Sequence, residues 1–410
     1  MAEHLDTLII GGGQAGLAAS YWLTQRGREH IVLEQAAHAA NVWRNDRWDS
    51  FTLVTPNWML RMPGAEYDGP DPDGFLLRDE VVAYLENYIT RFRVPMRYNV
   101  RVESVAPSGI GYRVQTSGDD YHALNVIIAT GLFQSPRLPS FADALPAGIT
   151  QLHSGQYRNP QTLPPGAVLV VGSAQSGSQI TDELVEAGRR VYLSTCGSSG
   201  RLPRRYRGHD GLRWFVGMGA MDRTVDKLPS PRAKFAGNPH VSGKDGGRTL
   251  NWHQFARDGV TLLGRIIGAE GHTLTFAPDL HDNLARADKF AAEFLKNADA
   301  YIATNGIDAP PETLPELRAG YAAEIITTLD LNAAGIRSVI WAMGYRCDYG
   351  LVKLPVTDSD GFPITRRGVT DFPGLYFLGL PWLHTPKSGL LFGVGEDAGF
   401  MVEHLVNAPR

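Results

Sequence analysis

The sequence predicts an α/β protein made of two doubly wound, three-layer domains, one inserted into the other. Two observations support this prediction. The chain contains two separate strand–glycine turn–helix units, and each is matched further along by an apolar strand that ends in glycine. The units begin at Gly11 and Gly172, so each has enough chain for a complete domain.

The first unit lies at the N-terminus. An apolar strand over residues 6–10 leads into Gly11–Gly16, which has the spacing Gly-x-Gly-x-x-Gly; a helix and a second strand ending at Glu34 follow. The glycines permit a tight turn and a close approach of backbone to a pyrophosphate, and the start of the helix offers free N–H groups. A carboxylate at Glu34 accepts hydrogen bonds from ribose hydroxyls. This unit therefore predicts a Rossmann-like dinucleotide site.

The second unit has the same layout without the acid. The strand 167–171 leads into Gly172–Gly177, which reads Gly-x-Ala-x-x-Gly, and the spacing that leads from Gly11 to Glu34 leads here to Thr195. The arginines Arg201, Arg204 and Arg205 come soon afterwards. Because guanidinium groups hold phosphate and a carboxylate repels it, we predict FAD at the first site and NADPH, with its 2′-phosphate, at the second. A solvated basic loop is the alternative reading of these arginines.

The expected domain limits follow from these units. Residues 1–150 and 335–410 form the FAD domain, and residues 151–334 form the inserted NADPH domain. Residues 200–260 are rich in Arg, Gly, Trp and Phe with weak periodicity, and we expect an insertion or lid over the nicotinamide. Amphipathic spacing predicts helices over 79–92, 178–187 and 283–296, and further short strands over 101–105, 111–115, 126–129, 190–194, 339–342 and 374–378.

The overall composition excludes several classes of protein. With a net charge of −4 and 20% charged residues the chain has no basic footprint for nucleic acid. Its two cysteines, Cys196 and Cys347, form no C-x-x-C pair, which argues against dithiol chemistry. The first strand begins too early to leave room for a signal peptide, and no uncharged apolar run is long enough for a membrane span. We expect a cytoplasmic protein with no membrane contact.

A resemblance now becomes specific. With the two turns, the pair Trp43-Arg44 after Glu34 and two Ala-x-Gly strand ends, the chain resembles the class B flavoprotein monooxygenases over nearly all of its 410 residues. That family carries the fingerprint Phe-x-Gly-x-x-x-His-x-x-x-aromatic before the NADPH turn. Residues 147–157 keep its histidine and its aromatic residue, His153 and Tyr157, but not its Phe and Gly.

The motifs and the resemblance together predict the binding residues. The predicted FAD contacts are Gly11, Gly13, Gln14, Ala15, Gly16, Glu34, Gln35, Val42, Trp43, Arg44, Trp48, Val102, Ala129, Thr130, Gly131, Gly379 and Leu391. The predicted NADPH contacts are Gly172, Ala174, Gln175, Ser176, Gly177, Thr195, Arg201, Arg204, Arg205, Ala342 and Gly344. No metal site is predicted. A core position is the alternative for Trp48.

For the remaining candidate residues the sequence leaves the role open. The resemblance implies that His153 orients the linker between the domains, and a purely structural histidine is the alternative. It also implies that Asn57 lies near the flavin, although here it stands in Thr-Pro-Asn and not in the family's usual Thr-Asn-x-Pro. His384 is a candidate for the substrate pocket, and a packing role is equally open.

The resemblance implies a function as well. NADPH reduces FAD, the reduced flavin and O₂ give a C4a-(hydro)peroxyflavin, and one oxygen atom passes to a small organic molecule. We favour N- or S-oxygenation, because the chain lacks the long N-terminal extension of many Baeyer–Villiger enzymes, and leave Baeyer–Villiger oxidation and a homodimer open. One alternative is an NAD(P)H:flavin oxidase that releases hydrogen peroxide; another is a flavin-binding regulatory protein without turnover.

Overall fold

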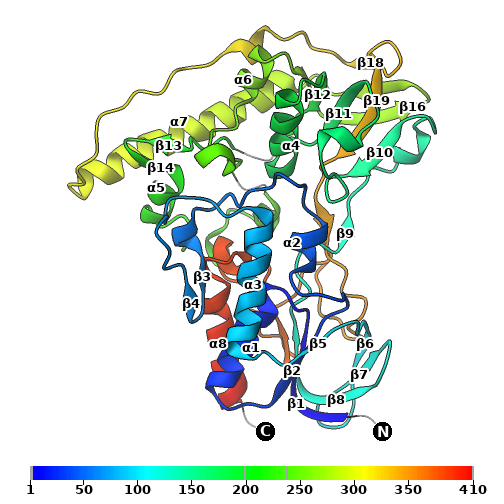
Figure 1. Cartoon of the computed structure of the whole chain (residues 1–410), viewed down its shortest axis with the longest axis vertical. Helices are drawn as coiled ribbons and strands as arrows, with labels where there is room; N and C mark the ends of the chain where they lie inside the picture. The colour runs from blue at the N-terminus through cyan, green and yellow to red at the C-terminus, as the bar shows by residue number, and fades with distance from the viewer. Residues whose placement is uncertain (1–2, 198–199, 237–238, 409–410) are drawn as a thin grey trace.

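The computed structural model describes residues 3–197, 200–236 and 239–408. Two sheets, each with its own helices, are stacked along the long axis of the molecule, and both ends of the chain lie at the same end of it (Figure 1). The part at the end with the termini is called the N-terminal domain here, and the part formed by the middle of the chain is called the inserted domain.

The sheet of the N-terminal domain has seven strands in the order β5-β2-β1-β8-β7-β6, and β21 also pairs with β8. Strands β5, β2, β1, β8 and β21 run parallel, whereas β6, β7 and β8 form an antiparallel meander. The strands are β1 (Glu3–Ile10), β2 (His30–Leu33), β5 (Met96–Arg97), β6 (Val102–Pro107), β7 (Tyr112–Thr116), β8 (Tyr121–Ile128) and β21 (Leu375–Phe377).

The two faces of this sheet are covered differently. Along β1, Ile9 points to the face covered by three helices, while Leu8 and Ile10 point to the other face. The helices are α1 (Gln14–Gln25), α3 (Arg78–Phe92) and α8 (Val394–Asn407), and the short α2 (Asn41–Asn45) lies beside α3. Segments between residues 349 and 383 cover the second face in place of helices.

The sheet of the inserted domain is entirely parallel, with five strands in the order β10-β19-β11-β12-β15. Its strands are β10 (Thr150–His153), β11 (Ala167–Val171), β12 (Val191–Ser194), β15 (Thr261–Leu263) and β19 (Ile336–Trp341). Helices α4 (Gln175–Glu186), α6 (Trp252–Arg257) and α7 (Leu280–Thr304) pack on one face. An antiparallel sheet of β16 (Ile266–Glu270), β17 (Thr273–Phe276) and β18 (Thr328–Asp330) covers the other.

The predicted fold class, α/β with parallel sheets, is confirmed. One helix differs from its prediction, because α7 runs to Thr304 and not to Lys296. Its added turns bury Ala298 and Ile302 against residues 202–221, in a core that Met59 and Phe392 of the N-terminal domain also enter.

Residues 200–260 contain the hairpin of β13 (Arg205–Tyr206) and β14 (His209–Asp210), and helix α5 (Gly211–Gly217). The part from Leu250 onwards was expected to belong to a lid, but Leu250, Trp252 and Phe255 lie in the core of the inserted domain. The chain crosses between the domains next to a two-stranded ribbon of β9 (Ser135–Pro136) and β20 (Tyr345–Arg346).

The remaining elements are short. They are the strands β3 (Arg61–Met62) and β4 (Ala65–Glu66) and the 3₁₀ turns η1 (Asn57–Met59), η2 (Ala142–Ala144), η3 (Pro160–Thr162), η4 (Val225–Lys227), η5 (Pro231–Phe235), η6 (Lys244–Gly246), η7 (Ala319–Ala322) and η8 (Pro386–Gly389). In the described part of the chain, no helix has both the length and the apolar character needed to cross a bilayer.

Candidate functional site: two glycine turns and the junction between them

The first glycine turn is built as its motif predicts. A side chain on Gly11 or Gly16 would collide with the backbone oxygens of Ala129 and Gly11 respectively. Gly13 differs, since a Cβ there would meet nothing within 4 Å. Helix α1 begins at Gln14 with no side-chain cap, so its first N–H groups face open space in front of Gly13. This arrangement suits a pyrophosphate at the start of α1.

The carboxylate of Glu34 faces this turn. Its Oε2 accepts a hydrogen bond from the backbone N–H of Gly12 at 2.9 Å, and its Oε1 accepts one from Ala36 at 2.9 Å. Each oxygen keeps a second lone pair for a ribose hydroxyl. Gln35 is exposed next to it.

The predicted flavin contacts in the segment after Glu34 have different surroundings. Trp43 packs partly buried between the cores of the two domains. Arg44 forms an ion pair with Glu86 of α3 at 2.5 Å, so a pyrophosphate contact would require that pair to open and stays a prediction. Trp48 is buried in the core of the inserted domain against Phe51 and Tyr157, as the core alternative expects, and a flavin contact at this position stays a prediction.

The C-terminal segment lies over the first turn. A Cβ on Gly379 would collide with that of Ala15, and the Gln14 side chain donates a hydrogen bond to the carbonyl of Gly389 at 2.7 Å. Leu391 is buried in the same core as α1. Thr130 and Gly131 follow β8 beside the turn, whereas Val102 of β6 packs against the opposite face of the sheet.

The second glycine turn repeats the first. A Cβ on Gly172 would stand 2.5 Å from the carbonyl oxygen of Ala342, and one on Gly177 would collide with Gly172. Helix α4 has Ala174 at its N-cap position and no side-chain cap, so its N–H groups are also left for an external acceptor. Gly344, after β19, has open space in front of it.

Gln175 ties this turn to the inserted segment. Its amide nitrogen donates to the carbonyl of Val241 at 2.5 Å, and its amide oxygen accepts from the N–H of Val241 at 3.1 Å. Ser176 stays half-buried next to it.

The three predicted phosphate ligands are mostly engaged elsewhere. Arg204 is 1% exposed and forms an ion pair at 2.5 Å with Asp210, the N-cap residue of α5, so a phosphate contact would require that pair to open and stays a prediction. Arg201 binds Asp288 at 2.8 Å. Arg205 is exposed and donates to the carbonyl of Gly246 at 3.1 Å.

A residue of α7, which the sequence did not single out, stands where the acid of the first site would be. The Asn283 amide donates to both oxygens of Thr195, and its own oxygen accepts a hydrogen bond from Arg286 at 2.5 Å. The Arg286 guanidinium lies against Gly197, is exposed and has no carboxylate within ion-pair distance among the described residues. Arg286 follows Asn283 by three residues on the same helix face, and this spacing is the sequence feature from which their contact could have been predicted.

The two fingerprint residues are buried at the crossing between the domains. His153 Nε2 lies 3.0 Å from the carbonyl oxygen of Gly344, and its ring meets Tyr345 edge-on. Burial holds the pKa of His153 below its usual value. The hydroxyl of Tyr157 donates to Glu183 of α4 at 2.8 Å. Both side chains therefore join the crossing segments to the inserted sheet.

Asn57 lies in η1, and one of its polar atoms makes no hydrogen bond to the described residues. Its amide nitrogen donates to the carbonyl of Asp71 at 2.9 Å, but its Oδ1, like Nε1 of the next residue Trp58, is buried with no hydrogen-bond partner among them. A buried acceptor and a buried donor are each costly unless a bound molecule completes them, so these atoms fit a polar cofactor or ligand. His384 is half-buried, and its carbonyl accepts from Val225 of the inserted segment.

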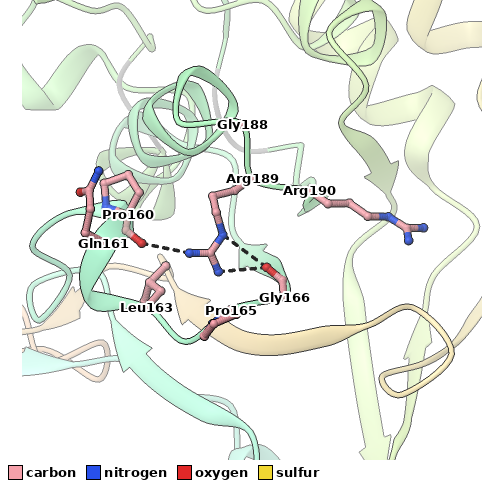
Figure 2. A pocket seen from close by; sticks show the side chains of 8 residues that line it. All are labelled: Pro160, Gln161, Leu163, Pro165, Gly166, Gly188, Arg189 and Arg190. Carbon is pink, nitrogen blue, oxygen red and sulfur yellow. Dashed lines mark hydrogen bonds between the residues drawn. The ribbon is translucent and has the colours of Figure 1, made fainter.

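A cavity of about 440 Å³ lies away from this chemistry, next to the first residues of β11 and β12. Figure 2 shows Arg189 in it, donating to the carbonyl oxygens of Pro160 and Gly166; the carbonyl oxygen of Pro164 accepts a further hydrogen bond. The backbone carbonyls take up the hydrogen bonds of the Arg189 guanidinium and hold it in place, and the cavity lies at the ends of β11 and β12 that are remote from the second glycine turn. Among the described residues no group of three or more His, Cys, Asp or Glu side chains is placed to hold a metal ion.

Comparisons with known proteins agree with this arrangement. The family model described as pyridine nucleotide-disulphide oxidoreductase matches residues 8–204. The chain is 33% identical to an uncharacterized CzcO-like oxidoreductase of Geobacillus kaustophilus, over 99% of this chain and 100% of that protein. It is 31% identical to the probable indole-3-pyruvate monooxygenase YUCCA1 of Arabidopsis thaliana, over 49% of each chain.

A solved structure is similar along the whole chain. The flavin-containing monooxygenase from Stenotrophomonas maltophilia superposes with a TM-score of 0.65 and 20% identity, covering 98% of both chains. At that identity the likeness establishes the fold.

Proposed function

The chain belongs to the CzcO-like oxidoreductases, within the class B flavoprotein monooxygenase family, and we propose that it oxygenates the nitrogen or sulfur of a small organic molecule. FAD and NADPH are its cofactors. When they are bound, the flavin takes up a hydride from the nicotinamide and activates O₂, which amino-acid side chains cannot do.

One observation supports this proposal above the others. The chain has two uncapped helices behind two glycine turns, with a carboxylate, Glu34, beside one turn and, beside the other, the guanidinium of Arg286, which forms no ion pair with the described carboxylates. An acid favours ribose hydroxyls and a guanidinium favours a ribose phosphate. We therefore assign FAD to the turn at Gly11 and NADPH to the turn at Gly172.

The chain's own residues then have separable tasks. The starts of α1 and α4 bind the two pyrophosphates, and the glycines let the backbone come close. Gln14 and Gln175 hold the segments that cover each turn, which keeps water out of the reaction site. Oδ1 of Asn57 and Nε1 of Trp58, which have no partner among the described residues, would supply an acceptor and a donor to a bound polar group.

Isotope labelling with product analysis tests the proposal. Purified FAD-loaded protein is supplied with NADPH, labelled dioxygen and a panel of amines, sulfides and ketones, with peroxide measured alongside. Label in an N- or S-oxide together with substrate-stimulated NADPH consumption supports the proposal. Label only in esters derived from the ketones would replace it with Baeyer–Villiger oxidation.

Two further results would overturn it. NADPH consumption with matching peroxide and no labelled product would make the protein an oxidase. A yellow protein that NADPH does not bleach would make it a flavin-binding protein without turnover.

A further inference from the structure

A segment of the inserted domain, residues 222–235, contacts the N-terminal domain near both of its ends and is called the strap here. At its start, Oδ1 of Asp222 lies 2.7 Å from Nζ of Lys387 in η8. The backbone N–H of Val225 donates a hydrogen bond to the carbonyl of His384 at 2.8 Å. These two contacts join the strap to the C-terminal segment that lies over the first glycine turn.

The end of the strap is held on a second part of the N-terminal domain. Nζ of Lys234 lies 2.9 Å from Oδ2 of Asp358 and 4.2 Å from the ring centre of Phe362. The ring of Phe235 meets that of Phe362 edge-on, with 5.8 Å between the two centres. Because Phe362 belongs to the core on the second face of the sheet, this end of the strap is attached to a firmly packed part of the domain.

The strap has no core of its own. None of residues 222–235 is buried, and the side chain of Asp222 is 63% exposed. A segment with few buried apolar contacts opens at a lower free-energy cost than the domain on which it lies. The attachment of the strap therefore depends on its ion pairs, and salt weakens ion pairs at a surface.

A series of contacts leads from the strap to the first glycine turn. Lys387, the partner of Asp222, lies in η8, and the carbonyl of Gly389 at the end of η8 accepts a hydrogen bond from Gln14 at 2.7 Å. Gln14 is the first residue of α1, directly behind the turn to which we assign the pyrophosphate of FAD. A movement of the C-terminal segment away from α1 would therefore pull on the ion pair of the strap.

We propose that the strap controls the entry and release of FAD. Its ion pairs hold the C-terminal segment against the first turn of α1, and a dinucleotide bound there leaves only when that segment moves away. Opening of the ion pairs is then a step of flavin exchange, and it involves no chemistry. This inference rests on our placement of FAD at the turn of Gly11.

The rate of FAD release tests the inference. Protein loaded with radiolabelled FAD is mixed with an excess of unlabelled FAD, and the label that stays bound is followed over time. In the double variant Asp222→Asn/Lys234→Met we expect FAD to leave about fivefold to tenfold faster than in the wild type, because both ion pairs are lost. Sodium chloride should accelerate release from the wild type more than from the double variant.

The matched control is the double variant Asp226→Asn/Lys244→Met, which makes the same two charge changes in the same part of the chain. Asp226 is exposed in the strap, and Lys244 pairs with Glu186 of α4 within the inserted domain. This variant should release FAD at the rate of the wild type.

Equal release rates in the wild type and the strap variant would overturn the inference, as would equal acceleration in the control. A wild-type release rate that does not respond to salt would overturn it without any variant. If the strap variant lost NADP⁺ faster but FAD at the wild-type rate, the strap would cover the other turn, and the inference would fail with our placement of FAD. Since release is measured without turnover, a failure of oxygen transfer would refute the proposed function and leave this inference standing.

Discussion

The two glycine turns have the same backbone and opposite electrostatics. At the first, Glu34 ends β2 and its carboxylate is held by the N–H groups of Gly12 and Ala36. At the second, Thr195 follows β12 and, through Asn283, orients the guanidinium of Arg286. The difference teaches that glycine spacing sets the shape of the turn, whereas the residues around the end of the second strand set its charge; on our proposed assignment, that charge selects a ribose hydroxyl or a phosphate.

The same comparison explains how each pocket is covered. Gln14 and Gln175 occupy the same place in their motifs, and each donates a hydrogen bond to the backbone of a distant segment. Gln14 binds Gly389 of the C-terminal segment, and Gln175 binds Val241 of the inserted one. The glutamine at this position of the motif therefore holds a different covering segment at each turn.

The largest effect is expected from filling the first turn. Gly13→Val should leave the fold intact, because a side chain there meets nothing within 4 Å, but should block the approach of a pyrophosphate to α1. We expect less than about a tenth of the wild-type flavin content. Flavin absorbance of the purified variant is the measurement, and Gly148→Val, at an exposed glycine with equal room, is the control. Full flavin occupancy in Gly13→Val would contradict our placement of FAD.

The second effect tests the charge at the other turn. Arg286→Ala should raise the dissociation constant of NADPH by about tenfold to a hundredfold, since a charge-assisted hydrogen bond contributes roughly 1.5–3 kcal/mol. The dissociation constant of NADH should not change. Fluorescence titration of both nucleotides measures the difference.

The control for that experiment is Arg205→Ala, which removes an exposed arginine bonded only to a backbone carbonyl and should alter neither affinity. An equal loss of NADPH and NADH binding in Arg286→Ala would show that the residue does not read the phosphate. If only Arg205→Ala lost affinity for NADPH, the phosphate would be bound by the loop that carries Arg205 and not by Arg286.

The smallest effect concerns the cover of the second turn. His240, next to Val241, is fully buried against Trp252, and burial together with the charge of Arg201 lowers the pKa of His240 to about 3. Below pH 6.5 the unfolded chain therefore binds a proton that the folded chain does not. The free energy of unfolding consequently decreases as the pH is lowered from 6.5 to about 3.

His240→Leu removes that titration. Between pH 6 and pH 4 we expect its unfolding free energy to fall less steeply than that of the wild type, by about 1.4 kcal/mol per pH unit. Denaturant unfolding across that range is the measurement, and His272→Gln, at an exposed histidine, is the control. Parallel pH profiles for His240→Leu and wild type would refute this account.

Much of the fold could be predicted from local pattern. Strand β1, helix α1 and both glycine turns were predicted because a continuous apolar run and glycine spacing are patterns of a few neighbouring residues. Helix α7 was predicted too short, although Ala298 and Ile302 continue the apolar spacing of its earlier turns; the inserted segment buries these last turns. Helices were expected on both faces of the first sheet, but loops cover one of them, and loops leave no periodic signal.

The site residues divide in the same way. The sequence by itself determined the two turns, Glu34 and the absence of an acid at Thr195, because each lies at a fixed distance along the chain from a glycine that the backbone requires. Only the tertiary structure decided which arginine is available: it buries Arg204 against Asp210 and brings Arg286 to Thr195 from a helix far along the chain. The physical reason is that ion pairing and burial depend on contacts between distant segments, whereas turn geometry depends on neighbouring residues.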